Sequence, residues 1–133
     1  MARSLMNTSA RREHGREVQR MIETKIREYL LSNVYTAIYL ETPKTMPDEC
    51  VIFRIIDRSW SNLIDTVTVE INSYAKTKEE AAELDASVRR AMNAFSYEDD
   101  ISASKLSGGN DANDTTLKRY RYRCFYNITY MEE

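Results

Sequence analysis

The stretch VTVEINSYAKTKEEAAELDASVRRAM (residues 67–92) changes from one periodicity to another within a few residues. Over Val67–Ala75, apolar or small residues alternate with polar residues or tyrosine, which is typical of a half-buried strand. Thr77 and Glu80 then have the spacing of a capping box, in which the threonine hydroxyl accepts a hydrogen bond from the Glu80 backbone N–H. The stretch therefore predicts a strand that ends at about Ala75 and a helix that begins after Thr77.

Two helices are predicted, each with its apolar residues on one side. The helix that follows Thr77 carries a stripe about 100° wide, made of Ala81, Leu84, Val88, Ala91, Met92 and Phe95. A longer helix is predicted from about Arg12 to Leu31, with these apolar residues at helical spacing: Val18, Met21, Ile22, Ile26, Tyr29 and Leu30. Because each helix can bury only one side, we expect both to lie on a sheet.

The sheet is predicted from five strand-like segments. Besides the strand described above, they are Val34–Leu40, Cys50–Arg58, a weaker one at Ile101–Leu106, and residues 117–131, which read LKRYRYRCFYNITYM. Short links between strands favour antiparallel pairing. The order helix, three strands, helix, two strands predicts an α+β fold, with two helices packed on one face of a largely antiparallel sheet of about four to five strands.

Length and composition bound the organisation of the chain. It has 133 residues, 42% of them apolar, which is enough for one globular domain with a core and too short for two. Residues 1–11 are mostly polar and small and show no periodic pattern, so we expect a flexible N-terminal arm there and a single α+β domain over residues 12–133. The formal net charge is -2 and the pI is about 5.6, so the strong positive field of a dedicated nucleic-acid-binding protein is absent.

The lengths of the apolar runs and the spacing of the cysteines indicate the cellular compartment in which the protein is expected. Neither a signal peptide nor a run of about 18 apolar residues is present, so we expect a soluble protein made in a reducing cytosol, with no membrane partner. Cys50 and Cys124 lie far apart without a CxxC pair, which argues against a zinc framework and indicates two reduced thiols. The glycosylation sequon at Asn127 has no role in that compartment.

The chain offers no motif for catalysis. Its only histidine, His14, stands among charged residues and is expected on the surface. Asp57 and Asp65, which flank Trp60, form the one pair of carboxylates considered for acid–base chemistry, and residues at strand ends are ordinarily solvated. The acidic segments lack the spacing of a calcium loop, and Gly108–Gly109 indicates a turn. The sequence therefore predicts no catalytic residue, no cofactor and no metal site.

The run MPDECVIFRIIDRSWSNLIDTVTVEINSYAKTKEEAAELDASVRRAM (residues 46–92) resembles the tail-terminator or tail-completion proteins of long-tailed bacteriophages. In that family a Pro-Asp/Glu pair opens a strand, a polar turn leads to a second strand, and a Thr/Ser-x-x-Glu-Ala step begins a helix. The corresponding features here are Pro47–Glu49, Ser59–Asn62, Val67–Ala75, and Thr77 to Ala81. The likeness in element order extends over about residues 12–131, although the turn carries RSWSN where glycine-containing versions are common.

The resemblance implies a structural virion protein and not an enzyme. Proteins of this family are small α+β domains that associate as a hexameric ring, cap the head-proximal end of the tail tube and join the tail to the head connector or head-closure protein. A location in the neck of the virion, between head and tail, is therefore implied, after assembly in the host bacterial cytoplasm. The implied partners are further copies of the chain, the tail tube protein and the connector, with DNA passing through the lumen without sequence-specific binding.

Six residues are candidates for a subunit or partner interface: Trp60, Asp48, Glu49, Arg119, Arg121 and Arg123. A closed ring needs two complementary patches on each subunit, and the three arginines on one face of the last strand could pair with the mostly acidic loops of a neighbour. Equally, the arginines could have no role other than to solubilise an outward sheet face. Trp60 lies in a polar turn, where an indole is well placed for an interface, although it could also fold back on the core.

Two alternative functions remain open. One is another head–tail joining or minor tail component of a phage. The other is a nucleic-acid-binding module that uses the C-terminal Arg/Tyr strand as a stacking and phosphate surface. On that strand, however, the tyrosines alternate with the arginines and so fall on opposite faces, whereas a stacking module displays both on one exposed face.

Overall fold

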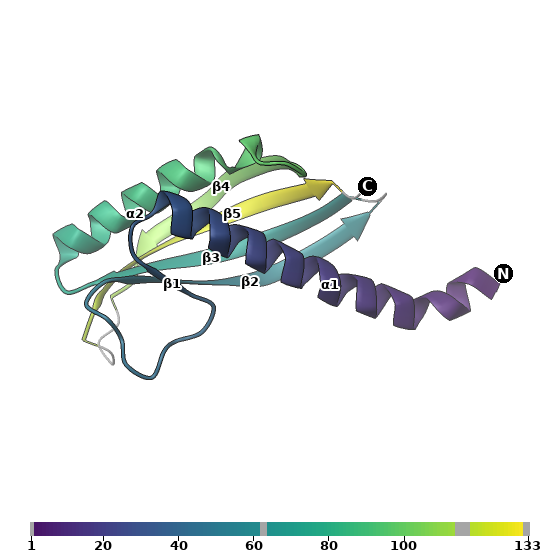
Figure 1. Ribbon diagram of the computed structural model, residues 1–133, viewed down its shortest axis with the longest axis horizontal. Coiled ribbons are helices and arrows are strands. Elements are labelled where there is room, and N and C mark those ends of the chain that lie inside the picture. Colours follow the sequence, from purple (N-terminus) through teal and green to yellow (C-terminus); the bar gives the residue numbers. More distant parts are fainter. Residues whose placement is uncertain (1, 62–63, 114–117, 132–133) are drawn as a thin grey trace.

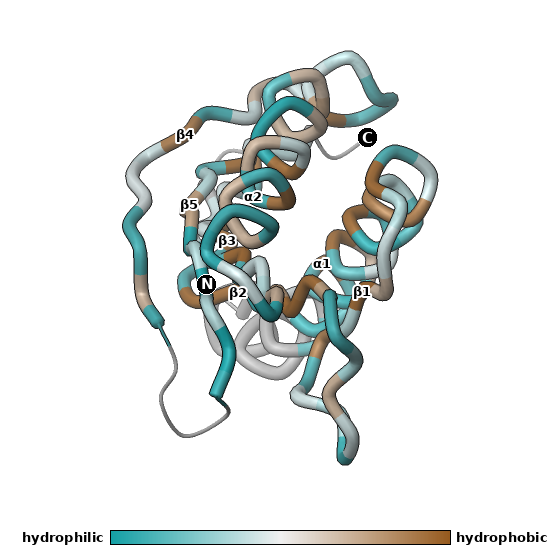
Figure 2. The backbone as a smooth tube through the Cα atoms, turned by 90° about the vertical axis from the view of Figure 1, so that its left-hand side faces the viewer, coloured by the Kyte–Doolittle hydropathy of each residue, from teal (hydrophilic) through white to brown (hydrophobic). Residues whose placement is uncertain are grey.

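The computed structural model describes the backbone of residues 2–61, 64–113 and 118–131, and the side chains of these residues except 2–12, 14, 61 and 131. Its elements, in chain order, are α1 (Ala2–Asn33), β1 (Ala37–Tyr39), β2 (Cys50–Ser61), β3 (Ile64–Ala75), α2 (Lys78–Asn93), the 3-10 helix η1 (Phe95–Tyr97), β4 (Ile101–Asp111) and β5 (Tyr120–Met131). Both α-helices lie on one side of a five-stranded sheet (Figures 1 and 2). The predicted α+β class and order of elements are confirmed.

The sheet is mixed, with β3 at its centre. The strand order is β1-β2-β3-β5-β4, and β2 with β3, β3 with β5, and β5 with β4 pair antiparallel, as expected. β1 instead pairs with β2 in parallel, with Ala37 opposite Cys50. The expectation of antiparallel pairing is wrong at this one link, because residues 40–49 carry the chain back to the end of the sheet at which β1 begins.

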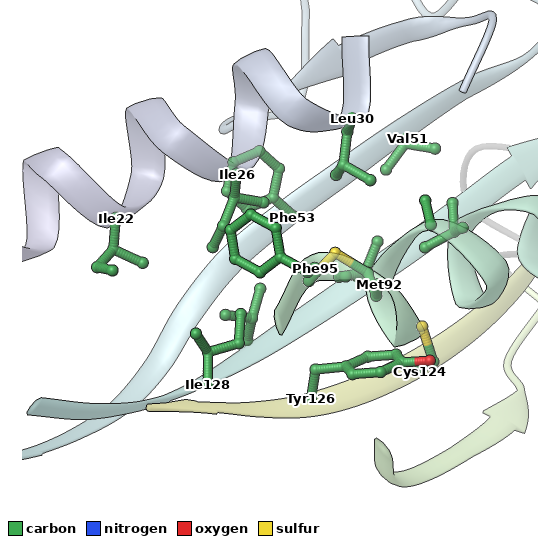
Figure 3. Close-up of a cluster of buried hydrophobic side chains, with 14 of the residues drawn as sticks. Ile22, Ile26, Leu30, Val51, Phe53, Met92, Phe95, Cys124, Tyr126 and Ile128 are labelled. Carbon is green, nitrogen blue, oxygen red and sulfur yellow. The ribbon is translucent and has the colours of Figure 1, made fainter. Parts of the chain in front are cut away.

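The core lies between the sheet and the two helices (Figure 3). Ile22, Ile26 and Leu30 of α1 contribute to it, as do Phe53 of β2 and Tyr126 of β5, and all five side chains are fully buried. At roughly 25 cal/mol per Å² of apolar surface removed from water, this layer is the main source of stability.

The helices also contact each other. The ring centroids of Tyr29 and Phe95 lie 4.8 Å apart, and the Tyr29 hydroxyl donates a hydrogen bond to the Ala91 carbonyl oxygen at 2.6 Å. In the apolar stripe predicted on α1, Met21 is 51% exposed and Tyr29 is half-buried, whereas the other members are buried. The contact between the helices is therefore aromatic at one end of α1 and leaves apolar surface uncovered nearer its middle.

α1 begins at Ala2, well before its predicted start at about Arg12. The backbone of residues 2–11, which the sequence assigns to a flexible arm, is thus helical. Continuing an existing helix gains a hydrogen bond per residue without a new nucleation cost, so no apolar periodicity is required there. Figure 1 shows this part of α1 extending past the end of the sheet. Within the part of the chain that the structure describes, no helix is both long and apolar enough to cross a membrane.

The start of α2 is as predicted. Thr77 has extended backbone angles, and its hydroxyl accepts a hydrogen bond from the Glu80 backbone N–H at 3.1 Å. The helix begins with the next residue, and five members of its predicted apolar stripe are buried: Ala81, Leu84, Val88, Ala91 and Met92. Phe95, the sixth, is buried in η1.

β4 continues past its predicted end. The sequence predicts a strand over Ile101–Leu106 and a turn at Gly108–Gly109, but the strand runs on through both glycines, so the turn prediction is wrong. Gly109 is explained by close packing and not by a turn. A Cβ built on it would lie 2.9 Å from the Arg123 carbonyl oxygen and would overlap the Arg89 guanidinium. Glycine is required here by the close approach of neighbouring groups.

β5 follows the predicted segment 117–131 from Tyr120 onward, and Leu117 lies outside the described residues. Its twelve residues pair along the whole length of β3, from Ala75 opposite Tyr120 to Ile64 opposite Met131. The last strand of the chain is therefore inserted next to the central strand, with β4 outside it.

Gly109→Ala is expected to destabilise the protein by about 1–3 kcal/mol, the usual cost of overpacking, because the added methyl group meets the Arg123 carbonyl. Gly108→Ala is the matched control, since a Cβ at Gly108 would meet only Phe125, at an ordinary contact distance of 4.0 Å. Denaturant unfolding of both variants measures the difference. Equal stability of the two variants would contradict the packing explanation.

Candidate functional site

The face of the sheet turned away from α1 and α2, here called the helix-free face, collects polar and charged side chains. It includes alternate residues of three neighbouring strands: Cys50, Ile52 and Arg54 of β2, Thr68, Glu70, Asn72 and Tyr74 of β3, and Arg121, Arg123, Phe125 and Asn127 of β5. The intervening residues of β3, among them Val67, Val69 and Ile71, are buried under the helices. Because side chains alternate along a strand, one pairing register decides both faces.

One end of the helix-free face is covered by the loop that follows β1. Cys50, Ile52 and Tyr74 form a second buried cluster there, with Tyr39 and Met46 packed against it. β2 is therefore shielded on both sides in this part, which explains its nearly continuous apolar sequence.

A polar network lies beside this cluster. The Glu70 carboxylate accepts hydrogen bonds from the Asn72 amide at 2.9 Å and from the Arg54 guanidinium at 3.4 Å. Glu70 is only 8% exposed, whereas the Arg54 side chain is 67% exposed. Burial alone would raise the pKa of the Glu70 carboxyl, but the hydrogen bonds of Asn72 and Arg54 and the charges of Arg54 and Arg123 outweigh it, so this pKa lies below its ordinary value. Glu70 is thus a buried carboxylate kept ionised by its neighbours.

The three candidate arginines are half-buried and have partners within the chain: Arg121 and Arg123 lie on this face in β5, and Arg119 directly precedes that strand. Arg121 donates from Nε to the Ala112 carbonyl oxygen at 2.6 Å and from Nη1 to the Tyr74 hydroxyl at 3.2 Å. Arg123 donates from Nε to Asn110 Oδ1 at 3.2 Å. Arg119 donates to the adjacent Lys118 carbonyl oxygen at 3.4 Å. Arg121 and Arg123 therefore tie the end of β4 and the residue after it to the sheet, which is a structural task beside any role at an interface.

The polar network and Arg121 line a pocket of about 380 Å³ between the sheet and the loop after β1. Glu41 and Thr42 come from the loop, and Arg54, Glu70 and Arg121 from the sheet. Donors and acceptors of both signs thus converge at one place. Such a lining suits a polar segment of a partner protein better than an apolar ligand.

The central members of this site, Arg54, Glu70, Asn72 and Tyr74, were not among the candidates taken from the sequence. A signal was present, because Arg54 interrupts the apolar run Cys50–Ile56, and the other three residues alternate with apolar or small ones along Val67–Ala75. What the sequence lacked was the register of β2 with β3, which places Arg54 opposite Glu70.

The remaining candidates from the sequence lie apart from the network. Trp60 pairs with Asp65, which shares the parity of the buried Val67, so the indole belongs to the helix-covered face, where it is 39% exposed. Asp48 forms an exposed ion pair with Lys76 at 3.2 Å, and Glu49 beside it is exposed. The six candidate residues are therefore divided between the two faces and the loop that closes one end.

The carboxylates considered for acid–base chemistry are not brought together. Asp65 is fully buried and forms an ion pair with Arg58, Oδ1 to Nη2, at 2.6 Å. Asp57 is exposed and lies opposite Thr68 on the helix-free face. The two acids are on opposite sides of the sheet, so they cannot share a substrate.

No set of three metal-binding side chains is found among the residues described, which do not include the side chain of His14. Cys50 and Cys124 are both fully buried, on opposite faces of the sheet. Burial, the largest influence on each, raises the pKa of Cys50 to about 11 and that of Cys124 to about 12. Both thiols therefore stay protonated and unreactive at neutral pH.

Comparison with known proteins returned no match, either to a protein-family model or to a curated protein.

Glu70→Gln is expected to cost about 1 kcal/mol of stability at pH 7, the worth of the charge-assisted hydrogen bonds it weakens. Because the folded-state pKa of Glu70 is lowered, its contribution is fully present above the unfolded value of 4.5 and is lost as the pH falls through the folded value. Urea unfolding at pH 7 and pH 3 should thus show a smaller difference from wild type at pH 3 than at pH 7. Glu83→Gln, at an exposed position on α2, is the control and should be neutral at both. A cost at Glu70 that does not change with pH would contradict the ionised network.

Proposed function

We propose that this protein is a tail-terminator protein of a long-tailed phage, which forms a ring at the head-proximal end of the tail tube and joins the tail to the head connector. The observation that carries the proposal is the order of elements, a long helix, three strands, a capped helix and two strands, which is the layout of the family that residues 46–92 resemble. Supporting it, the sequence features that carry the resemblance coincide with element boundaries: Pro47–Glu49 directly precedes β2, and Thr77 caps α2.

The helix-free face is the surface assigned to the tail tube. Its centre is polar, with the Arg54–Glu70 pair and a hydrogen bond between Thr68 and Asn127 at 2.9 Å. Interfaces joined late, between proteins that first exist separately, are more polar than the interfaces of obligate homo-oligomers. A polar face held in one geometry by its own network suits a partner that arrives as a finished tube.

The nucleic-acid alternative receives less support from the described residues. Tyr126 and Tyr130 of β5 are buried under the helices, so these two rings have no free face on which a base could stack. Arg121 and Arg123, on the other face, already have partners within the chain. A phosphate surface would have to be built from the remaining cations.

Purified protein mixed with tail tubes is expected to cap one end of each tube, as seen in negative-stain images, and native mass spectrometry is expected to show six subunits per cap. Asn127→Arg adds charge and bulk at an exposed position of the helix-free face. It should abolish capping while the ring still forms. Glu83→Arg on α2 is the control and should cap normally. Binding to purified connector without any binding to tubes would instead identify another head–tail joining component.

A further inference from the structure

α1 extends beyond the body of the protein. Among its described side chains, the first that is buried in the core is Val18, and Gly15 lies over Arg58 of β2. Residues 2–12, here called the projecting segment, are helical and lie beyond the end of the sheet (Figure 1). At 1.5 Å per residue they span about 16 Å. Because helices in proteins are stabilised mostly by packing one face, a helix that projects in this way offers a surface to a partner.

The projecting segment is basic in a chain that is acidic overall. Residues 1–12 contain Arg3, Arg11 and Arg12 and no acidic residue, whereas the whole chain has a net charge of -2. The rest of the chain therefore carries an excess of acidic residues. Leu5 and Met6 add two large apolar residues to the segment. Its complement would be an acidic surface with some apolar area.

A surface of that kind lies along the other part of α1. Two hollows of about 440 and 430 Å³ share Lys25 and Glu28 as lining residues and lie between α1 and the turn that joins α2 to β4. We call them together the α1 groove. Met21 and Tyr97, which are 51% and 87% exposed, give the groove apolar area.

The wall of the α1 groove opposite α1 is acidic. Glu98 and Asp100 line the hollows, and Asp99 between them is exposed. The cations of the groove, Arg20 and Lys25, stand on the α1 side. At 0.1 M salt, exposed charges attract each other only within about 10 Å. A basic helix seated in the groove would lie within that range of the acidic turn and would be attracted to it.

We propose that the projecting segment of one subunit docks in the α1 groove of a second copy of this chain. The segment cannot reach its own groove, because α1 is one continuous helix and forms one wall of that groove. The contact joins two different surfaces, so it is head-to-tail, and repeated contacts of this kind form a ring when the rotation from one subunit to the next closes. The inference builds on the ring of the proposed function by naming its subunit contact, and it leaves the helix-free face to the tube.

Disulfide trapping tests the contact directly. Arg11→Cys and Tyr97→Cys are made in separate chains, which are then mixed under mild oxidation; Cys50 and Cys124 are fully buried and do not interfere. The expected result is a crosslink between the two variants in the mixture and none in either variant alone. A crosslink of Arg11→Cys chains to one another would show that projecting segments pair together and would overturn the proposal. The absence of any crosslink would overturn it as well.

Measuring self-association tests whether the basic segment and the acidic turn attract each other. Deleting residues 2–12, or combining Glu98→Gln, Asp99→Asn and Asp100→Asn, should weaken association in sedimentation equilibrium roughly tenfold or more. The matched control neutralises three exposed acids outside the α1 groove, in Asp57→Asn, Glu79→Gln and Glu83→Gln, and should associate as wild type does. Unchanged association of the deletion variant would overturn the proposal. If that variant associated normally but had lost affinity for DNA, the basic segment would bind DNA and not a second subunit.

The two proposals fail separately. Tubes capped by rings of the deletion variant would refute the subunit contact and leave the terminator role in place. A trapped head-to-tail contact in a protein that never caps tubes would do the reverse.

Discussion

The antiparallel register between β3 and β5 is the constraint on which the rest of the structure depends. It places Val69 opposite Tyr126 and Ile71 opposite Cys124 on the side of the helices. In the same step it places Glu70 and Asn72 opposite Phe125 and Arg123 on the other side. A slip of one residue would turn the buried apolar set to solvent and the charged set toward the core. Core and candidate site are therefore two consequences of one pairing.

Each face of the sheet carries one ion pair with a buried carboxylate, and the two pairs differ in their access to water. On the helix-covered face, Asp65 is paired with Arg58, which lies so close under Gly15 that a Cβ there would be 2.7 Å from its Nη1. A buried pair of this kind adds little net stability, because desolvation opposes the Coulomb attraction, but a misplaced partner would leave a buried charge. On the helix-free face, the Arg54–Glu70 pair stays near water on one side and can meet a partner.

The elements that could be predicted from the sequence are those with a local cause. The capping of α2 by Thr77 depends on residues three apart, and the alternation of β3 is visible within nine residues of sequence. The errors have causes distant in the sequence. Gly109 is glycine because of the Arg123 backbone and Arg89, and β1 is parallel to β2 because its connection folds back across the end of the sheet. The candidate site was found only in part for the same reason, since Arg121 was singled out from its own strand whereas Arg54 and Glu70 meet across strands.

The sequence by itself determined the class of the fold, the order of its elements and the apolar sides of both helices, because periodicity and capping are read from neighbours along the chain. Only the tertiary structure decided the partner of each strand, and with it which polar residues of the helix-free face lie together. It also decided that the arginines of β5 hold their own chain, and that α1 runs on past the sheet. These properties depend on groups brought together from separate segments, and a linear pattern contains no measure of that proximity.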